Sequence, residues 1–386
     1  MTTTGPAFGA PEDLQAWRAW QARQQPLLRR ARHAIGTSAA PVVHLHHDGG
    51  PVHTLVALES LGPTQRAALL EPMRFAPEET GVAYVVPPHV SQELVLGLVS
   101  SHHSDSVLPT WARVVDCLPA DAPLPAVLRS MTEVLAVGNY LPSGQVAHRW
   151  ADAAGVRFNV VQHGLLAHQA PPLPRGSHLL AFTDQDAAWW THGRTDVTTE
   201  VVGSQLLWSA AAQSAVRDAG QNADRRPEGP GVFLGQLHGA ELPRKDFAAA
   251  ALQYCRETGA MYRPHPAETD KLSRATHELW RRRGVRIDTS GQSLAAAIGP
   301  VASVFSTGVL EAACTGREAW VVHPDPPAWL QEFWLRYGMS RWSPGTPVEP
   351  TPALVQPETE PARAVARAIF GSSNGSAQTD QNRKVG

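Results

Sequence analysis

The chain alternates short apolar runs with longer stretches of mixed polarity. In its first half the apolar runs occupy residues 41–46, 52–58, 81–86, 113–117, 134–138, 158–162, 179–183 and 200–203. Most are apolar at consecutive positions, as expected of strands that are buried on both faces. Stretches with helical character, such as residues 63–70 and 145–154, separate several of the runs. This alternation favours a parallel sheet with helices on both of its faces.

A second series of the same kind follows a polar segment rich in Gly and Pro, residues 217–231, which is the best linker candidate. The predicted strands are residues 232–234, 260–263, 285–288, 302–305 and 319–323. The predicted helices are residues 245–258, 271–283, 293–298, 307–315, 328–337 and 358–369. The pattern therefore predicts an α/β protein with two Rossmann-like domains that face each other across a cleft.

The domain boundaries follow from these series. We expect an N-terminal helix within residues 1–36, a first domain over 37–216 and a second domain over 232–345. Residues 346–371 form a C-terminal segment that contains the last helix. Residues 372–386 are polar and are expected to be a disordered tail.

The N-terminal helix allows two interpretations. It carries Trp17 and Trp20 at helical spacing, and its end is basic, with Arg29, Arg30 and Arg32. In one interpretation it packs on the surface of the first domain. In the other it rests on anionic lipid and gives the protein a peripheral membrane contact.

Composition narrows the classes of function. With 386 residues, 43% of them hydrophobic, the chain is long enough to bury two cores. Its formal net charge of −2 gives no overall field that favours nucleic acid, so we expect no nucleic-acid partner. The N-terminus lacks the basic start and apolar core of a signal peptide, and no apolar run reaches the roughly 20 residues that span a bilayer. Cys117, Cys255 and Cys314 are isolated, without disulfide or zinc spacing, which fits a reducing cytoplasm.

Ligands of open α/β sheets bind beyond the carboxyl ends of the strands, so we expect catalytic and ligand-binding side chains there. In the first half, Gln162, His163 and Gly164 end an apolar strand. A neutral imidazole at this position is a candidate base for an acceptor hydroxyl, with Gln162 and Gly164 as acceptor contacts. The alternative is a hydrogen-bonded histidine with a purely structural role.

Two segments of the second half are candidates for binding an anion. Arg263 and His265 end a strand, and the prolines around His265 fix the backbone, so that both side chains can face a diphosphate. The sequence Ser306-Thr307-Gly308-Val309-Leu310-Glu311 leads from a strand into a helix whose first N–H groups suit phosphate oxygens, with Glu311 placed to accept ribose hydroxyls. The alternatives are a Pro-rich turn and an ordinary helix cap.

Two further strand ends give weaker signals. Gly235, Gln236 and His238 follow the first strand of the second domain and are candidate donor contacts. Asp48 follows the first apolar strand and is a candidate base or acceptor contact. The histidines beside Asp48 also suggest a metal, but a third ligand is not evident, so we expect none.

The order of these motifs resembles that of the CDP-glycerol glycerophosphotransferase family, which makes teichoic acid and belongs to the GT-B group. The shared pattern is Gln-His-Gly at a strand end, then Arg-Pro-His-Pro, then Ser-Thr-Gly-x-x-Glu at the start of a helix, over roughly residues 40–345. The layout is also similar to that of capsule polysaccharide glycosyltransferases. Asp48-Gly49 resembles the acidic motif of bacterial sialyltransferases, and we rank Asp48 below His163 as the base.

The resemblance implies a cytoplasmic transferase of the GT-B form. Such an enzyme moves a glycosyl or glycerophosphate unit from a nucleotide-sugar or CDP-alcohol donor to a glycan or lipid-linked glycan of the cell surface, and it needs no cofactor or metal. By resemblance, His163 is the base, His265 contacts the donor phosphates, and Ser306, Thr307 and Glu311 hold the pyrophosphate and ribose. The donor stays open between CDP-glycerol, a CMP-sugar and a UDP-sugar.

Two alternatives remain. A UDP-N-acetylglucosamine 2-epimerase has the same fold and a similar motif at the start of a helix, with a nearby Glu. A catalytically inactive GT-B protein would serve as a scaffold or sugar-binding partner. The tryptophans of the last part of the second domain, Trp329, Trp334 and Trp342, either stack on a ligand or fill the core.

Overall fold

The computed structural model describes residues 13–24, 41–92, 114–220, 229–237, 239–290, 294 and 299–371. The basic end of the first predicted helix, the core of the predicted linker, most of the short helix predicted at 293–298, the C-terminal tail and His238 lie outside these residues.

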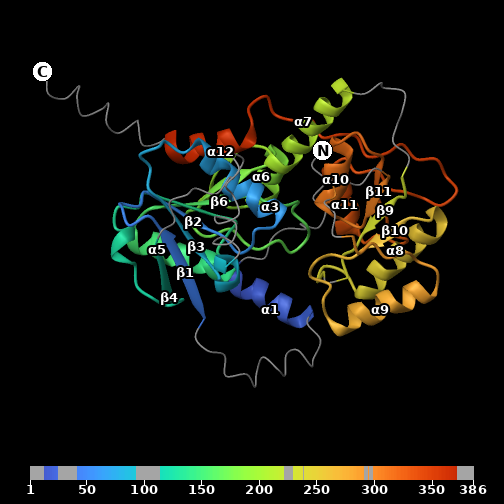
Figure 1. Ribbon diagram of the computed structural model, residues 1–386, viewed down its shortest axis with the longest axis horizontal. Helices are drawn as coiled ribbons and strands as arrows, with labels where there is room; N and C mark the ends of the chain where they lie inside the picture. The colour runs from blue at the N-terminus through green and yellow to red at the C-terminus, as the bar shows by residue number, and fades with distance from the viewer. Residues whose placement is uncertain are drawn as a thin grey trace, which may run out of the picture.

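The first unit is built on a sheet of eight strands in the order β4-β1-β3-β2-β5-β6-β7-β8 (Figure 1). The strands are β1 (Val42–His47), β2 (Thr54–Ala57), β3 (Val82–Val86), β4 (Val114–Pro119), β5 (Glu133–Ala136), β6 (Arg157–Val161), β7 (His178–Ala181) and β8 (Thr198–Val201). From β3 to β8 in this order, each strand is parallel to the next one. Every residue of β2, β3 and β5 is buried, as their continuous apolar sequence predicts.

Strands β1 and β4 depart from the parallel sheet that the sequence predicts. β1 is antiparallel to both β3 and β4, and β4 is an edge strand whose residues are exposed or half-buried. The reason lies in the connection: residues 48–53 alone join β1 to β2, and two parallel strands need a crossover of about a dozen residues or more. The chain therefore reverses direction after β1.

Helices cover both faces of this sheet. They are α3 (Pro63–Gln65), which continues into a π-helical turn (Arg66–Leu70) and a 3-10 turn (Glu71–Phe75), another 3-10 turn (Ala126–Leu128), α5 (Pro142–Ala154) and α6 (Asp184–Trp190). The last helix, α12 (Pro361–Phe370), also packs here, because Ala364, Val365 and Ile369 are buried in the same hydrophobic cluster as Leu70. The C-terminal segment thus returns to the first unit (Figure 1).

The second unit has a parallel sheet in the order β10-β9-β11-β12. Its strands are β9 (Val232–Leu234), β10 (Met261–Arg263), β11 (Val301–Ser303) and β12 (Ala319–Val321). A bridge from Tyr262 to Ile287 adds the segment predicted as a strand at 285–288, outside β10. The spatial order of the five segments, numbered along the chain, is therefore 3-2-1-4-5, that of a Rossmann unit.

The helices of the second unit are α8 (Arg244–Thr258), α9 (Lys271–Arg282), α10 (Thr307–Cys314) and α11 (Ala328–Arg336). Trp329 and Trp334 of α11 are buried in the core, and the Trp334 indole donates a hydrogen bond to the Val304 carbonyl at 2.8 Å. Core packing is therefore the correct interpretation of these two tryptophans.

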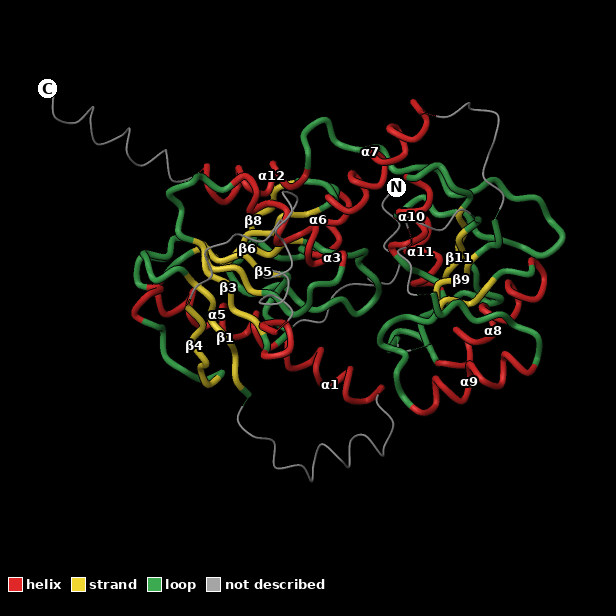
Figure 2. Tube along the Cα trace, viewed as in Figure 1, coloured by secondary structure: helices red, strands yellow, loops and turns green. Residues whose placement is uncertain are grey.

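Helix α7 (Gln205–Gly220) leads from the first unit to the second and contacts α10 (Figure 2). Residues 217–220, which the sequence assigns to the linker, are helical. The sequence-based fold class is confirmed: the protein is α/β with two Rossmann-like units. Within the described residues, no helix is long and apolar enough to cross a membrane.

A buried polar network joins the two units away from α7. Asp186, at the first turn of α6, accepts a hydrogen bond from Tyr337 at 2.5 Å and forms an ion pair with Arg336 at 3.3 Å. The Tyr337 hydroxyl also accepts a hydrogen bond from the Leu166 backbone N–H at 2.8 Å. Asp186 and Leu166 belong to the first unit. In the second unit, Arg336 is the last residue of α11 and Tyr337 follows it. These contacts therefore fix the two units against each other.

Candidate functional site

Each sheet has one point at which the connection from one strand leads to one side and a later connection leads to the other side; there the sheet diverges. In the first sheet the chain passes from β2 to β3 on one side and then returns to β5 on the other. In the second, β9 leads to β10 on one side and later to β11 on the other. Ligands of open α/β sheets bind at such points, beyond the carboxyl ends of the strands. The residues of the site are therefore expected at the ends of β2, β5, β6, β9, β10 and β11.

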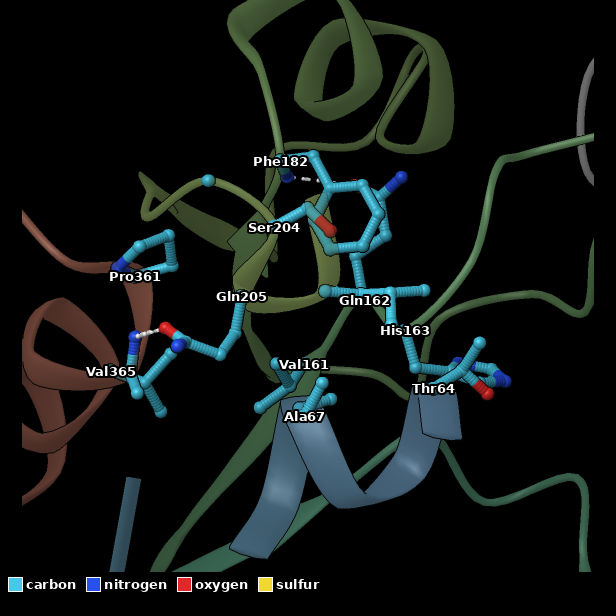
Figure 3. A pocket seen from close by; sticks show the side chains of 14 residues that line it. Thr64, Ala67, Val161, Gln162, His163, Phe182, Ser204, Gln205, Pro361 and Val365 are labelled. Carbon is cyan, nitrogen blue, oxygen red and sulfur yellow. Dashed lines mark hydrogen bonds between the residues drawn. The ribbon is translucent and has the colours of Figure 1, made fainter. Parts of the chain in front are cut away.

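His163 directly follows the segment of β6 and Gln162. The Gln162 side chain is buried, its oxygen accepts a hydrogen bond from Phe182 N at 2.8 Å, and its amide group donates to Gly164 O at 3.0 Å (Figure 3). Gln162 therefore shapes the turn that presents His163. Burial lowers the pKa of His163 to about 4, so the imidazole is neutral at pH 7 and can accept a proton.

His163 lines two hollows of different size. The smaller hollow is lined by His163 and Thr64 on one side and by Pro361 and Val365 on the other (Figure 3). Its volume is about 10 Å³, which holds at most one water molecule. This hollow is therefore too small for a substrate.

The larger hollow is a cavity of about 410 Å³, within the ~300–1,000 Å³ that is usual for small-molecule sites. Its walls come from helix α1 (Leu14–Gln24), from Tyr140, from Trp190 and from the loop of residues 162–171, which includes His163. Glu241 of the second unit completes the lining. The cavity thus lies where the two units meet, as the sequence-based cleft requires.

In the second unit, the predicted anion-binding groups at the end of β10 differ in exposure: Arg263 is half-buried and His265 is exposed. The Arg263 Nε donates to Asp288 Oδ2 at 2.6 Å, so its charge is already paired. His265 is exposed, and its Nδ1 accepts a hydrogen bond from Ala267 N at 3.1 Å, which leaves Nε2 as the N–H donor of the neutral ring. Partial desolvation lowers the pKa of His265, and the charge of Glu268 opposes this.

The segment that opens α10 forms a helix cap. Ser306 is the N-cap residue, and its hydroxyl accepts a hydrogen bond from Gly308 N at 3.1 Å. A Cβ at Gly308 would lie 2.5 Å from Leu234 Cδ1, so glycine here permits close packing of α10 on the end of β9. Thr307 is half-buried at the first position of the helix. Burial raises the pKa of Glu311, one turn further on, and Arg317 opposes this.

Gln236 joins the two strand ends at which the second sheet diverges. Its side-chain oxygen accepts hydrogen bonds from Ser303 Oγ at 2.9 Å and from Phe305 N at 3.1 Å. A Cβ at Gly235 would lie 2.3 Å from the Tyr262 hydroxyl, so this glycine is required by packing. Both residues therefore build the frame of the predicted donor site.

The prediction that Asp48 faces the cleft is wrong. Because β1 is antiparallel to β3, the carboxyl end of β1 lies at the sheet edge where the parallel strands begin. His163 follows the carboxyl end of a parallel strand, at the opposite edge. Asp48 is exposed, and its carboxylate accepts a hydrogen bond from Gly50 N at 2.8 Å within its own turn.

The sequence analysis missed Glu59 and Glu241. Glu59 follows β2 at the point where the first sheet diverges, and its carboxylate accepts a hydrogen bond from Ser143 N at the start of α5. Burial raises the pKa of Glu59 and also that of Glu241. The end of an apolar run at residue 58 was the available signal for Glu59. Nothing in the sequence around Glu241 indicates that it reaches the cavity.

The histidines beside Asp48 suggest a metal ion in the sequence. Across the described residues, no group of three or more His, Cys, Asp and Glu side chains is placed to hold a metal ion.

The comparisons with known proteins are sparse. No protein-family model and no curated protein match this chain. Among solved structures, the chain is similar to the UDP-GlcNAc 2-epimerase from Methanocaldococcus jannaschii, with a TM-score of 0.44 and 10% sequence identity over 82% of this chain and 99% of that chain. The class defined by the structure itself is that of two Rossmann-like units with a cavity between them.

Proposed function

We propose that the protein is a metal-independent transferase that moves a glycosyl or glycerophosphate unit from a nucleotide-activated donor to a hydroxyl of a cell-surface glycan. The observation that carries the proposal is His163, a histidine with a pKa of about 4 that lines a cavity of about 410 Å³ bounded by both units. At pH 7 this imidazole is neutral and can accept the proton of an acceptor hydroxyl, and its burial makes it a weaker base than an exposed histidine.

The donor belongs to the second unit in this proposal. The start of α10 supplies the positive end of a helix dipole beside the point where the second sheet diverges, and this favours phosphate oxygens. At the end of β10, Arg263 adds positive charge although it is paired with Asp288, and the His265 imidazole follows it. Together these groups would stabilise the charge that grows on the leaving phosphate.

The reaction then proceeds in one displacement. The acceptor hydroxyl loses its proton to His163, its oxygen forms a bond to the transferred carbon or phosphorus, and the bond from that atom to the nucleotide phosphate breaks. The acceptor is a growing teichoic acid or capsule-type glycan on the cytoplasmic side of the membrane.

The first experiment measures thermal stabilisation of the purified protein by CDP, CMP, UDP, GDP and ADP, with and without magnesium. A nucleotide at about 100 times its dissociation constant should add roughly 2.7 kcal/mol to the stability of the wild type, without magnesium. His265→Ala should lose much of this effect. His163→Ala should keep it, because His163 is placed with the acceptor, and should lose transfer of the labelled donor group to glycan.

Three outcomes contradict the proposal. Absence of stabilisation by every nucleotide removes the donor site. Equal transfer by wild type and His163→Ala removes the base. A sugar epimer that forms from a nucleotide-sugar without any acceptor identifies an epimerase instead.

A further inference from the structure

The side chain of Trp17 anchors helix α1 to the first unit. Trp17 is only 6% exposed, its indole N–H donates to the Gln169 carbonyl at 2.9 Å, and its ring meets Tyr140 edge-on with 5.4 Å between centroids. Trp17, Trp20 and Gln21 are three and four residues apart, so they share one face of the helix. All three line the cavity of about 410 Å³.

The lining of this cavity combines aromatic rings with hydrogen-bonding side chains. The rings are Trp17, Trp20, Tyr140 and Trp190. The side chains that can form hydrogen bonds include Gln21, His163, Gln169 and Glu241. Such a lining suits a ligand that has apolar faces and a rim of hydroxyl groups.

The backbone at Gln169 supports a binding role for this wall. Gln169 has a φ of 64°, and it is the one non-glycine residue with positive φ in the described parts of the chain. A non-glycine residue in the left-handed region costs free energy, and such residues occur in turns and cluster at functional sites. Here it accompanies the contact in which the Gln169 carbonyl receives the Trp17 indole N–H and ties α1 to the loop.

The charges in the cavity exclude two other classes of ligand. Arg18 and Glu241 are its only charged lining groups, one of each sign, so a phosphate would meet a carboxylate with one exposed arginine to balance it. A lipid chain would cover the polar groups of Gln21 and Glu241 with apolar surface, and the Glu241 carboxylate would keep only hydrogen bonds of its own turn, such as that from Ala240 N at 2.9 Å. A pyranose offers C–H faces to the rings and hydroxyl donors to the carboxylate.

We infer that α1 and the loop of residues 162–171 form a binding site for an uncharged pyranose unit, which packs against the aromatic lining that includes Trp20 and donates a hydroxyl hydrogen bond to Glu241. Its identification as the acceptor site, with one sugar hydroxyl facing His163, rests on the proposed function. Its capacity to bind a sugar does not.

The test is binding of sugars without any nucleotide. The methyl pyranosides of glucose, galactose, mannose and N-acetylglucosamine, and maltose as a disaccharide, are titrated into the full-length protein and followed by calorimetry and saturation-transfer NMR. The cavity variants are Trp20→Ala and Glu241→Gln, since both residues are partly exposed and their replacement leaves the core intact. The matched controls are Trp208→Ala on α7 and Glu257→Gln on α8, neither of which lines the cavity.

We expect at least one pyranoside to bind with a millimolar Kd, weakened about tenfold or more in both cavity variants and within about twofold of wild type in both controls. The inference is overturned if no sugar binds up to about 50 mM, if cavity variants and controls behave alike, or if geranyl phosphate binds there in place of sugar. Sugar binding without nucleotide stabilisation contradicts the transferase and leaves this inference standing. Nucleotide stabilisation without sugar binding does the reverse.

Discussion

At the scale of single residues, the titration of His163 gives a direct test of its burial. Burial lowers the pKa of His163 from 6.5 to about 4. Below a pH of about 6.5 the unfolded chain therefore binds more protons than the folded protein, and His163 costs the folded state stability as the pH falls from about 6.5 to about 4, below which both states are protonated.

The matched comparison is His163→Gln, which removes this titration. The unfolding free energy of wild type minus that of the variant should fall between pH 6.5 and 4, by at most about 3 kcal/mol and by less to the extent that water reaches the ring. Urea unfolding at a series of pH values measures the difference. His46 has a similarly lowered pKa, but it titrates in both proteins and cancels. A difference that is constant with pH would show a solvated ring.

Some single residues of the candidate site can be predicted from the sequence, and others cannot. His163, Arg263 and Ser306 are predicted near strand ends from apolar runs that stop at polar residues. Arg263 ends β10, and His163 and Ser306 lie two and three residues beyond β6 and β11, which are also parallel strands. Asp48 follows an equally good run, but the direction of β1 is set by its partners β3 and β4. Glu241 reaches the cavity by a contact between units, which leaves no local pattern.

At the scale of elements, the start of α5 depends on a glycine. A Cβ at Gly144 would lie 2.0 Å from the carbonyl oxygen of Gly138, so the loop after β5 and helix α5 approach as closely as the backbone allows. In an open helix, Gly→Ala stabilises by up to about 1 kcal/mol. Here the sign should reverse, and Gly144→Ala should destabilise by about 2 kcal/mol or more because neither backbone can yield freely.

The control for this change is Gly371→Ala. Gly371, at the end of α12, has helical φ and ψ of −70° and −25°, and a Cβ there meets nothing within 4 Å. Chemical denaturation should therefore show Gly371→Ala to be neutral or slightly stabilising. Equal effects of the two substitutions would mean that α5 can shift away from Gly138. Such a shift would also disturb the hydrogen bond from Ser143 N to Glu59.

The pattern of apolar runs predicts where strands lie but not in which direction they run. The strands of the second unit were predicted within one to two residues at most ends, because each is a short apolar run between clear polar stretches. The bounds of β1 and β4 were predicted equally well, but their antiparallel direction was not, because a run of apolar residues carries no information about strand direction. The exposed valines of β4 made it look like a buried strand.

At the scale of the whole molecule, the contact of Asp186 with Arg336 and Tyr337 decides how firmly the units are joined. The Tyr337 hydroxyl donates a hydrogen bond to Asp186 and accepts one from Leu166 N, so it forms two hydrogen bonds with the first unit. Tyr337→Phe leaves the buried Leu166 N–H without its hydroxyl partner and should cost about 1–3 kcal/mol. Asp186→Asn weakens the same contact from the other side.

A double-mutant cycle separates this contact from ordinary loss of packing. If the two side chains stabilise the protein through each other, Tyr337→Phe combined with Asp186→Asn should cost at least about 0.5 kcal/mol less than the sum of the single changes. Calorimetry should also show the two units unfolding less cooperatively in the single variants, because their shared network is weakened. Strict additivity would mean that α7 and the return of α12 hold the units together without this network. The cavity that contains His163 and Glu241 would then keep its shape in both variants, and the proposed nucleotide and sugar binding would be unchanged.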